Sequence, residues 1–252
     1  MDNSPDKSPA ARGRTVNGGV PVAPAAVLFD AYGTLFDVYS VGLLAEQLFA
    51  GRGEALALLW RDKQIEYTRL VTMSAPDGSR YRPFWDITRA ALRFAASRLG
   101  LTLGSDAEDR LMNQYRALSA FPDVREVLGQ LKALGVTTGI LSNGDPAMLG
   151  VAVRSAGIEA LLDHVISVEP VRAFKTDPRA YGLGPATLGL AARQILFVSS
   201  NGWDAIGATW YGYTTLWVNR AGLPLEQLDT APTRTGASLR DVLGFFPAAV
   251  AT

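Results

Sequence analysis

Short apolar runs alternate with amphipathic stretches along most of the chain. Each apolar run is four to six residues long and precedes turn-forming residues, which is typical of a buried strand. Five such runs predict strands at Ala26–Phe29, Val136–Leu141, His164–Val168, Ile195–Val198 and Thr214–Val218. Because helical patterns separate several of these runs, the alternation predicts an α/β fold built on a doubly wound, mostly parallel sheet.

Two of the intervening stretches carry clear signals for the ends of helices. The stretch 121–134 places apolar residues at helical spacing and is followed by Gly135. The stretch 146–156 begins with proline directly behind Asp145 and stops at Gly157. Aspartate before a helix and proline at its first position favour helix initiation, and glycine after it favours termination, so both stretches are predicted helices.

The interval 38–120 interrupts this alternation, because its pattern is almost entirely helical. It includes long helical stretches at 54–73 and 83–99. We therefore predict an α/β core made of residues 25–37 and 121–245, with residues 38–120 inserted as a helical cap. An insertion directly after the first strand lies over the carboxyl ends of the strands, where ligands bind in open α/β sheets.

The first 24 residues differ from the rest of the chain in composition. They are rich in proline, glycine, alanine and polar residues, and they lack the continuous apolar stretch of a signal peptide or a membrane span. Such a composition buries little apolar surface. Residues 1–24 are therefore predicted to be a disordered tail.

Composition and charge narrow the classes of function. The chain has 252 residues, of which 48% are hydrophobic, and its 24 basic residues balance 24 acidic ones. A neutral chain has no electrostatic footprint for nucleic acid or an anionic membrane, so we expect neither as a partner and favour a small molecule. The absence of cysteine and the single histidine, His164, exclude thiolate and histidine-cluster metal sites and suit a cytoplasmic protein.

Polar residues follow the predicted strands and are expected to converge on one crevice at the same edge of the sheet. They are Asp30, Thr34, Ser142, Asn143, Lys175, Ser199, Ser200, Asn201 and Asp204. Any one of these groups alone has an ordinary interpretation as turn or N-cap residues. Their arrival at one topological edge from separate strands favours a functional site.

Several of these residues lie in segments that resemble the L-2-haloacid dehalogenases of the haloacid dehalogenase superfamily. The resembling segments are Phe29–Val38, Leu59–Thr68, Ile140–Gly144, Lys175–Tyr181 and Phe197–Asp204. The resemblance extends from about Ala26 to Leu243, and its motifs occur in order in both the predicted core and the predicted cap. It implies a hydrolytic dehalogenation of short 2-haloalkanoic acids that needs no cofactor.

Because the superfamily fold hosts both phosphatases and dehalogenases, two positions are needed to separate them. Superfamily phosphatases usually carry a second aspartate two residues after the nucleophile, and here that position is Tyr32. Their magnesium cluster begins where this chain has Asn201, which leaves Asp30 and Asp204 as a poor cage for a hard cation. No metal is therefore expected. A magnesium-dependent phosphatase and a catalytically silent binding protein of this fold remain the alternatives.

The resemblance assigns the first chemical step to three residues. Asp30 is the expected nucleophile, and Lys175 beside it keeps the carboxylate ionised. Arg61 faces the departing halide, where its charge would stabilise the transition state more than the substrate. On the helical pattern alone, Arg61 would be interpreted as part of a solvated face, so this role comes from the resemblance.

Further roles follow from the same resemblance. Asn143 and Trp203 add halide contacts, and Ser142 with nearby backbone amides and the start of the helix after Asp145 would hold the substrate carboxylate. For hydrolysis of the ester, the expected residues are Thr34, Lys175, Ser199, Asn201 and Asp204. Without the motif, Asp204 would be an equally good N-cap for the helix that begins near Trp203.

The remaining expectations concern the wall of the pocket and the assembly. The apolar or aromatic residues expected around the substrate are Tyr32, Trp60, Ile65, Phe84, Tyr181 and Trp203. The partners implied are a small 2-haloacid, a halide ion and a second copy of the chain in a homodimer. Two positions depart from the family pattern: Asp62 follows Arg61, where a neutral amide is usual, and Thr176 replaces the proline usual after Lys175. We expect the carboxylate of Asp62 to point away from the pocket.

Overall fold

The computed structural model describes residues 23–246. The predicted tail at 1–24 therefore lies outside the described residues, except for its last two positions. Within the described range, no helix is long and apolar enough to cross a membrane.

A six-stranded, fully parallel sheet forms the centre of the molecule, in the order β3-β2-β1-β4-β5-β6. The strands are β1 (Ala26–Phe29), β2 (Thr137–Ser142), β3 (His164–Ser167), β4 (Ile195–Ser199), β5 (Thr214–Val218) and β6 (Arg234–Gly236). The five predicted strands are confirmed to within one residue at their ends. The short edge strand β6 was not predicted, because its sequence Arg-Thr-Gly is exposed or half-buried and carries no apolar run.

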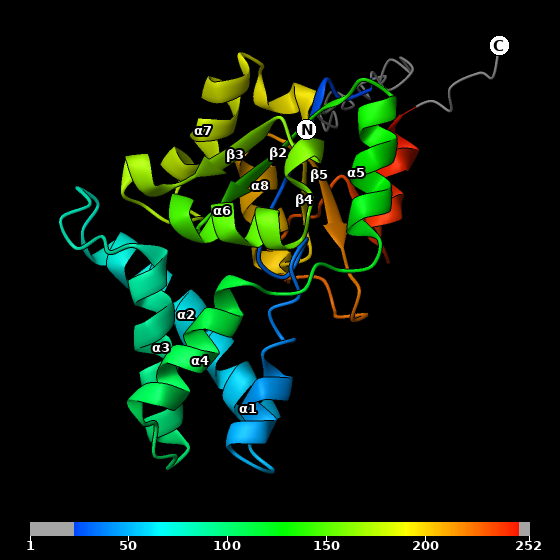
Figure 1. Cartoon of the computed structure of the whole chain (residues 1–252). Helices are drawn as coiled ribbons and strands as arrows, with labels where there is room; N and C mark the ends of the chain where they lie inside the picture. Colours follow the sequence, from blue (N-terminus) through cyan, green and yellow to red (C-terminus); the bar gives the residue numbers. More distant parts are fainter. Residues whose placement is uncertain (1–22, 247–252) are drawn as a thin grey trace, which may run out of the picture.

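Four helices flank the sheet (Figure 1). They are α5 (Val124–Ala133), α6 (Pro146–Ser155), α7 (Pro178–Leu188) and α8 (Gly202–Tyr211). Short 3-10 helices occur at Glu159–Leu161, Glu169–Val171, Ala192–Gln194 and Leu239–Phe245. Helix α6 starts as expected, with proline at its first position and the Asp145 side chain accepting a hydrogen bond from the Met148 amide at 3.0 Å. The predicted doubly wound α/β fold is confirmed.

The interval 38–120 is helical, as its pattern predicts. It contains α1 (Gly42–Leu48), α2 (Gly53–Ser74), α3 (Phe84–Arg98) and α4 (Ser105–Arg116), which lie together on one side of the sheet (Figure 1). Arg61 of α2 donates a hydrogen bond at 3.1 Å to the carbonyl of Tyr32, three residues after the end of β1. The helical group α1–α4 therefore faces the carboxyl ends of the strands.

The chain leaves and re-enters the sheet region through two segments that lie side by side. The Asp37 amide donates to the Ser119 carbonyl at 2.8 Å, and the Phe121 amide donates to the Leu35 carbonyl at 3.0 Å. This pairing fixes both ends of the insertion relative to each other. On this basis we propose that the division into a core and an inserted helical unit lies at 37/38 and 120/121.

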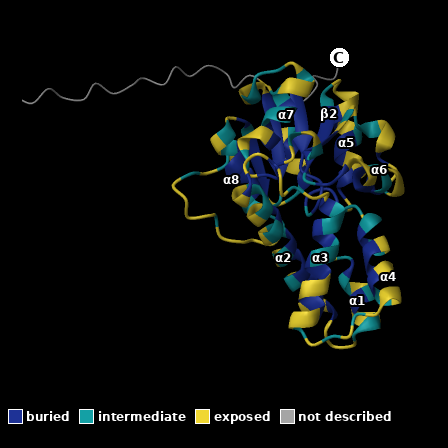
Figure 2. Ribbon diagram, turned by 90° about the vertical axis from the view of Figure 1, so that its left-hand side faces the viewer, coloured by how far each residue is buried: buried dark blue, intermediate teal, exposed yellow. Residues whose placement is uncertain are grey.

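The buried side of α2 changes character along its length. Near its start it buries Leu56, Ala57 and Trp60, whereas from residue 61 onward it buries the polar side chains of Arg61, Gln64 and Thr68. These positions share one face because residues three and four apart are neighbours on a helix. Figure 2 shows that burial is concentrated in the strands and the inward helix faces. Helix α2 thus places a row of buried polar side chains near the carboxyl end of β1.

Asp123 joins three separate parts of the core at the start of α5. Its carboxylate accepts two hydrogen bonds from Arg220, at 2.9 and 3.0 Å, and one from the Leu239 amide at 2.8 Å. Burial opposes ionisation, but these donors outweigh it and hold the pKa of Asp123 below its usual value.

We expect Asp123→Asn to lower the free energy of unfolding by about 1–3 kcal/mol at neutral pH, because an amide loses the charge-assisted bonds to Arg220. Urea denaturation followed by circular dichroism measures the change. Asp109→Asn, at an exposed position on α4, is the matched control and should change stability by less than about 0.5 kcal/mol. Equal stabilities of the two variants would contradict the assignment.

Candidate active site

Asp30 lies at the end of the central strand β1 and is only 6% exposed. One carboxylate oxygen, Oδ2, accepts hydrogen bonds from Thr34 Oγ1 at 3.1 Å and from Asn201 Nδ2 at 2.9 Å. The other oxygen, Oδ1, accepts from Lys175 Nζ at 3.0 Å. Three donors from three different segments therefore fix this carboxylate in a single orientation.

Lys175 connects Asp30 to a second buried carboxylate. Its ammonium is fully buried and lies 3.0 Å from Asp30 Oδ1 and 2.9 Å from Asp204 Oδ2. Burial alone would lower the pKa of Lys175, but the two carboxylates outweigh this effect and raise the pKa above its usual value. The raised pKa favours the charged form of Lys175. It is reached through the 3-10 turn Glu169–Val171 and a short loop, not directly from the end of β3.

Asp204 is completely buried in the first turn of α8. Its Oδ1 accepts a hydrogen bond from the Tyr181 hydroxyl at 2.7 Å, and its Oδ2 accepts from Lys175. Burial raises the pKa of Asp204, and Lys175 and the Tyr181 hydrogen bond only partly oppose this effect. The alternative that Asp204 caps this helix is wrong, because the N-cap residue is Asn201.

Asn201 occupies the N-cap position of α8, but its side chain does not cap the helix. Its Nδ2 donates to Asp30 Oδ2 and to the Tyr32 carbonyl, and its Oδ1 accepts from Arg61. A Cβ atom at Gly33 would lie 3.4 Å from both polar atoms of the Asn201 side chain, and Gly33 has a φ of +94°. Glycine thus permits both the turn after Asp30 and the close approach of Asn201.

Arg61 reaches from α2 into this network and is 7% exposed. Its Nη2 donates to the Tyr32 carbonyl and to Asn201 Oδ1, both at 3.1 Å, and its Nη1 donates to Gln64 Oε1 at 2.7 Å. All three acceptors are neutral oxygens. The guanidinium of Arg61 is therefore held by three hydrogen bonds, and none of the three acceptors is charged.

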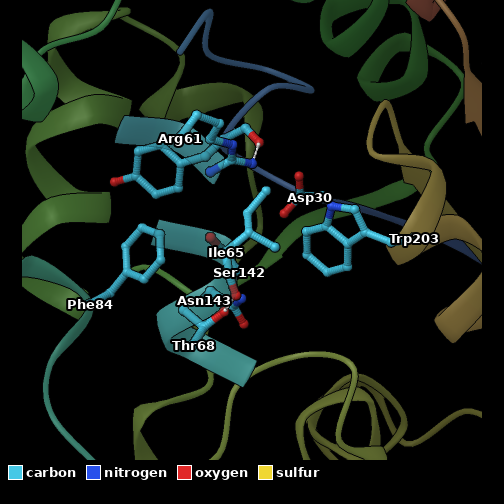
Figure 3. A pocket seen from close by; sticks show the side chains of 9 residues that line it. Asp30, Arg61, Ile65, Thr68, Phe84, Ser142, Asn143 and Trp203 are labelled. Carbon is cyan, nitrogen blue, oxygen red and sulfur yellow. Dashed lines mark hydrogen bonds between the residues drawn. The ribbon is translucent and has the colours of Figure 1, made fainter. Parts of the chain in front are cut away.

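A small cavity lies against Asp30 (Figure 3). Its water-accessible volume is ≈ 10 Å³, which is room for about one water molecule. The residues around it are Asp30, Tyr32, Arg61, Ile65, Thr68, Phe84, Ser142, Asn143 and Trp203. Ile65 and Trp203 also line an outer groove of ≈ 730 Å³. These two side chains therefore form the wall between the cavity and the groove.

The structure brings together most of the residues that the sequence singles out. The residues proposed for substrate and halide binding that line the cavity are Tyr32, Arg61, Ile65, Phe84, Ser142, Asn143 and Trp203. Thr34, Lys175, Asn201 and Asp204 form the hydrogen-bonded network behind Asp30. Ser199 lies one step farther away, where its buried Oγ accepts from the Asn201 amide at 3.2 Å.

Three expectations about position need correction. Tyr181 does not line the cavity, because its hydroxyl is directed to Asp204. Trp60 is 1% exposed and belongs to the core, where its indole donates to the Thr88 carbonyl at 2.8 Å. The amino end of α6 does not face the cavity as a free anion site, because the carboxylate of Asp145 accepts hydrogen bonds there from the Met148 and Trp85 amides.

The polar residues after β2 hold the loops of the site in place. Asn143 Oδ1 accepts a hydrogen bond from the Lys175 amide at 2.8 Å, so its side chain fixes the loop that carries the ammonium. Ser142 Oγ accepts from the Gly144 amide at 3.1 Å and remains on the cavity wall. The hydroxyl of Tyr32 is buried and has no hydrogen-bond partner among the described residues.

Two residues of the site were not predicted. Thr68 lines the cavity, and Gln64 bonds directly to Arg61. Both lie in the segment that resembles the family, but the sequence reasoning gave them no role. A signal was present, because polar residues at 61, 64 and 68 continue the spacing of the apolar stripe that begins at Leu56.

The donor set does not fit a divalent metal ion. The Lys175 ammonium already occupies the position between the carboxylates of Asp30 and Asp204, and Asn201 contributes an amide that donates to Asp30. Across residues 23–246, no group of three or more His, Cys, Asp or Glu side chains is arranged to hold a metal ion. Lysine thus supplies the positive charge at this position.

The two departures from the family pattern lie outside the cavity. Asp62 is exposed and lines the outer groove, so its carboxylate does not face the cavity. Thr176 is also exposed and lines the same groove, and the peptide bond that joins it to Lys175 is cis.

Comparison with known proteins places the chain in a family. The model of the haloacid dehalogenase-like hydrolases matches residues 24–212. The chain belongs to the haloacid dehalogenase-like hydrolases. Within this family, an (S)-2-haloacid dehalogenase of Pseudomonas sp. strain YL is 42% identical over 223 residues, which are 88% of this chain and 94% of that protein. The predicted resemblance is confirmed.

Solved structures of haloacid dehalogenases share the fold of this family member. A crystal structure of an L-2-haloacid dehalogenase is 58% identical, has a TM-score of 0.87 and covers 89% of this chain and 99% of its own. The L-2-haloacid dehalogenase of Xanthobacter autotrophicus, with chloropropionic acid covalently bound, is 35% identical with a TM-score of 0.80, over 87% of this chain and 96% of its own.

We expect Tyr181→Phe to raise the pKa of Asp204, because the hydroxyl donates a hydrogen bond that favours the ionised carboxylate. NMR titration of 13C-labelled aspartate measures the shift, with Asp204→Asn identifying the resonance. Tyr211→Phe is the matched control, since that ring packs against Tyr181 but its hydroxyl makes no hydrogen bond to Asp204. An unchanged titration in Tyr181→Phe would show that the hydrogen bond has no effect.

Proposed function

We propose that this chain hydrolyses the carbon–halogen bond of short (S)-2-haloalkanoic acids and releases halide and (R)-2-hydroxyalkanoic acids. The observation that carries the proposal is the Asp30 carboxylate, oriented by Lys175, Asn201 and Thr34 at the wall of a cavity that Arg61 also lines. The names of the relatives in the family support the same reaction.

In the first step, Asp30 attacks the carbon that bears the halogen. A carboxylate oxygen forms a C–O bond, the C–halogen bond breaks, and the halide leaves with the bonding electrons, so the carbon is inverted. Arg61 is suited to stabilise the departing halide because its hydrogen bonds to neutral oxygens leave its charge uncompensated. The covalently bound chloropropionic acid in the Xanthobacter protein supports an ester of this kind.

In the second step, water attacks the carboxyl carbon of the Asp30 ester. Asp204 accepts the proton of that water, and burial, which raises its pKa above the usual value, makes it a stronger base than a solvated aspartate. With Oδ1 as the attacking oxygen, the Asn201 amide and the Thr34 hydroxyl, which both donate to Oδ2, stabilise the charge that develops at the ester carbonyl. The Lys175 ammonium contacts Oδ1, the ester oxygen, and lies 2.9 Å from Asp204. The bond between the carboxyl carbon and the ester oxygen breaks, and this oxygen takes the proton held by Asp204 and leaves as the product hydroxyl. The regenerated carboxyl group of Asp30 then loses its proton to solvent.

The substrate carboxylate lies in this proposal against Ser142 and the backbone amides near Asn143 and Tyr32. The side chains of Ile65, Phe84 and Trp203 enclose the rest of the substrate. Enclosure strengthens each charge contact, because water no longer screens it. A helical cap, a homodimer and a cytoplasmic location, which the family resemblance also implies, remain predictions.

A magnesium-dependent phosphatase is the less suitable alternative. A tyrosine with a buried hydroxyl, Tyr32, occupies the position of the acid that protonates the leaving alkoxide, and burial raises its pKa well above the usual value. The ammonium of Lys175 lies where a cation would bridge Asp30 and Asp204. No observation favours a catalytically silent binding protein, because Thr34, Lys175 and Asn201 all donate hydrogen bonds to Asp30.

We expect the protein to release chloride from (S)-2-chloropropionate in the presence of a chelator, and Asp30→Asn to reduce this activity at least about 10³-fold, because a nucleophile is lost. Chloride release and chiral chromatography of the product measure both the rate and the inversion.

Asp37→Asn is the matched control in the same segment, because its carboxylate only accepts a hydrogen bond from the Tyr39 amide outside the cavity. It should retain the wild-type rate. Loss of activity on chelation, or full activity of Asp30→Asn, would exclude the proposed reaction.

A second prediction follows the oxygen atoms. In 18O-labelled water, the product of the first turnover should carry unlabelled oxygen from Asp30, and after many turnovers the peptide that contains Asp30 should gain the label. Mass spectrometry of the product and of proteolytic peptides measures both. Label in the first-turnover product together with an unlabelled Asp30 peptide would instead indicate direct attack by water on the substrate.

A further inference from the structure

Gln64 lies one turn after Arg61 on α2 and is completely buried. Its Oε1 accepts hydrogen bonds from Arg61 Nη1 at 2.7 Å and from the Tyr115 hydroxyl at 3.0 Å. Its Nε2 donates to Thr88 Oγ1 at 2.6 Å. A buried amide with three hydrogen bonds is fixed in position, because breaking any of them leaves an unpaired polar group in the interior.

The orientation of this amide is set by its neighbours. The Thr88 hydroxyl donates its single proton to the Phe84 carbonyl at 2.7 Å, so it can only accept from Gln64. The guanidinium of Arg61 can only donate. The oxygen of Gln64 must therefore face Arg61, and its nitrogen must face Thr88.

This arrangement joins three helices to the site. Gln64 belongs to α2, Thr88 to α3 and Tyr115 to α4. Arg61 in turn contacts Asn201 and the Tyr32 carbonyl after the strands. Gln64 is thus the point at which the packing of the helical group determines where the guanidinium lies relative to Asp30.

The neutrality of Gln64 has a chemical consequence. A carboxylate at this position would accept the same hydrogen bond from Arg61, but it would also neutralise the guanidinium. A neutral amide oxygen orients the group and leaves its positive charge available to a second anion. Of the five N–H groups of an arginine, three donate to Gln64, Tyr32 and Asn201, and all three of these acceptors are neutral.

We propose that Gln64 is a positioning residue that fixes Arg61 through a neutral acceptor and so preserves its charge for the departing halide. The inference rests on the proposed dehalogenation. It places Gln64 outside contact with the substrate, since Gln64 does not line the cavity. Its effect should therefore appear in how strongly the rate depends on the leaving group.

The test compares Gln64→Glu and Gln64→Met with the wild type on 2-chloropropionate and 2-bromopropionate. We expect kcat/KM for the chloro substrate to fall between about 10-fold and 10²-fold in both variants, because the guanidinium is neutralised in one and loses its acceptor in the other. The loss for the bromo substrate should be several-fold smaller, since bromide is the better leaving group. Inhibition by free bromide should weaken in parallel.

Gln47→Glu on the exposed face of α1 is the matched control and should leave both rates and bromide inhibition unchanged. Thermal melting checks the fold of each variant, and if Gln64→Glu does not fold, the uncharged Gln64→Met variant carries the test alone. Equal losses for the two substrates, or unaltered bromide inhibition, would overturn the positioning role. Absence of halide release by the wild type would refute the proposed function itself.

Discussion

The ammonium of Lys175 between the carboxylates of Asp30 and Asp204 is the interaction on which the site depends. All three groups are buried, so neither carboxylate is stabilised by bulk water. Removing one partner of such a buried pair typically costs about 3–5 kcal/mol, because it leaves an uncompensated charge in the interior. Asn143 holds the Lys175 backbone in place, and Arg61 brings a second positive charge that is hydrogen-bonded only to neutral oxygens.

The sheet explains why these groups meet. Strand β1 lies between β2 and β4, and the segments after all three strands deliver side chains to the same edge. Asn201 shows what the site requires of the local structure. It lies where a side chain would normally cap α8, but it bonds to Asp30, Arg61 and Tyr32 instead. The Asn201 side chain does not cap the helix and instead joins a hydrogen-bond network with residues far along the chain. Such departures from local preference are common at functional sites.

Periodicity and turn chemistry were enough to predict five of the six strands and the helical insertion, because short apolar runs and end signals such as Asp145-Pro146 act locally. The resemblance supplied Arg61 and Lys175, which no local pattern assigns to the site. Tyr181 was misplaced and Gln64 was given no role, because their functions depend on partners far along the chain: Tyr181 donates to Asp204, and Gln64 contacts residues of two other helices. Contacts between residues so far apart in the chain produce no recognisable pattern in a short stretch of sequence.

The wall formed by Ile65 and Trp203 affects how molecules enter and leave the cavity beside Asp30. On one side lies space of ≈ 10 Å³ and on the other a groove of ≈ 730 Å³. The guanidinium of Arg69 lies over the Trp203 ring at 5.4 Å and steadies it. A molecule larger than water that enters from the groove must displace one of these side chains to pass. The frequency of that displacement therefore limits how often the cavity can be filled from the groove.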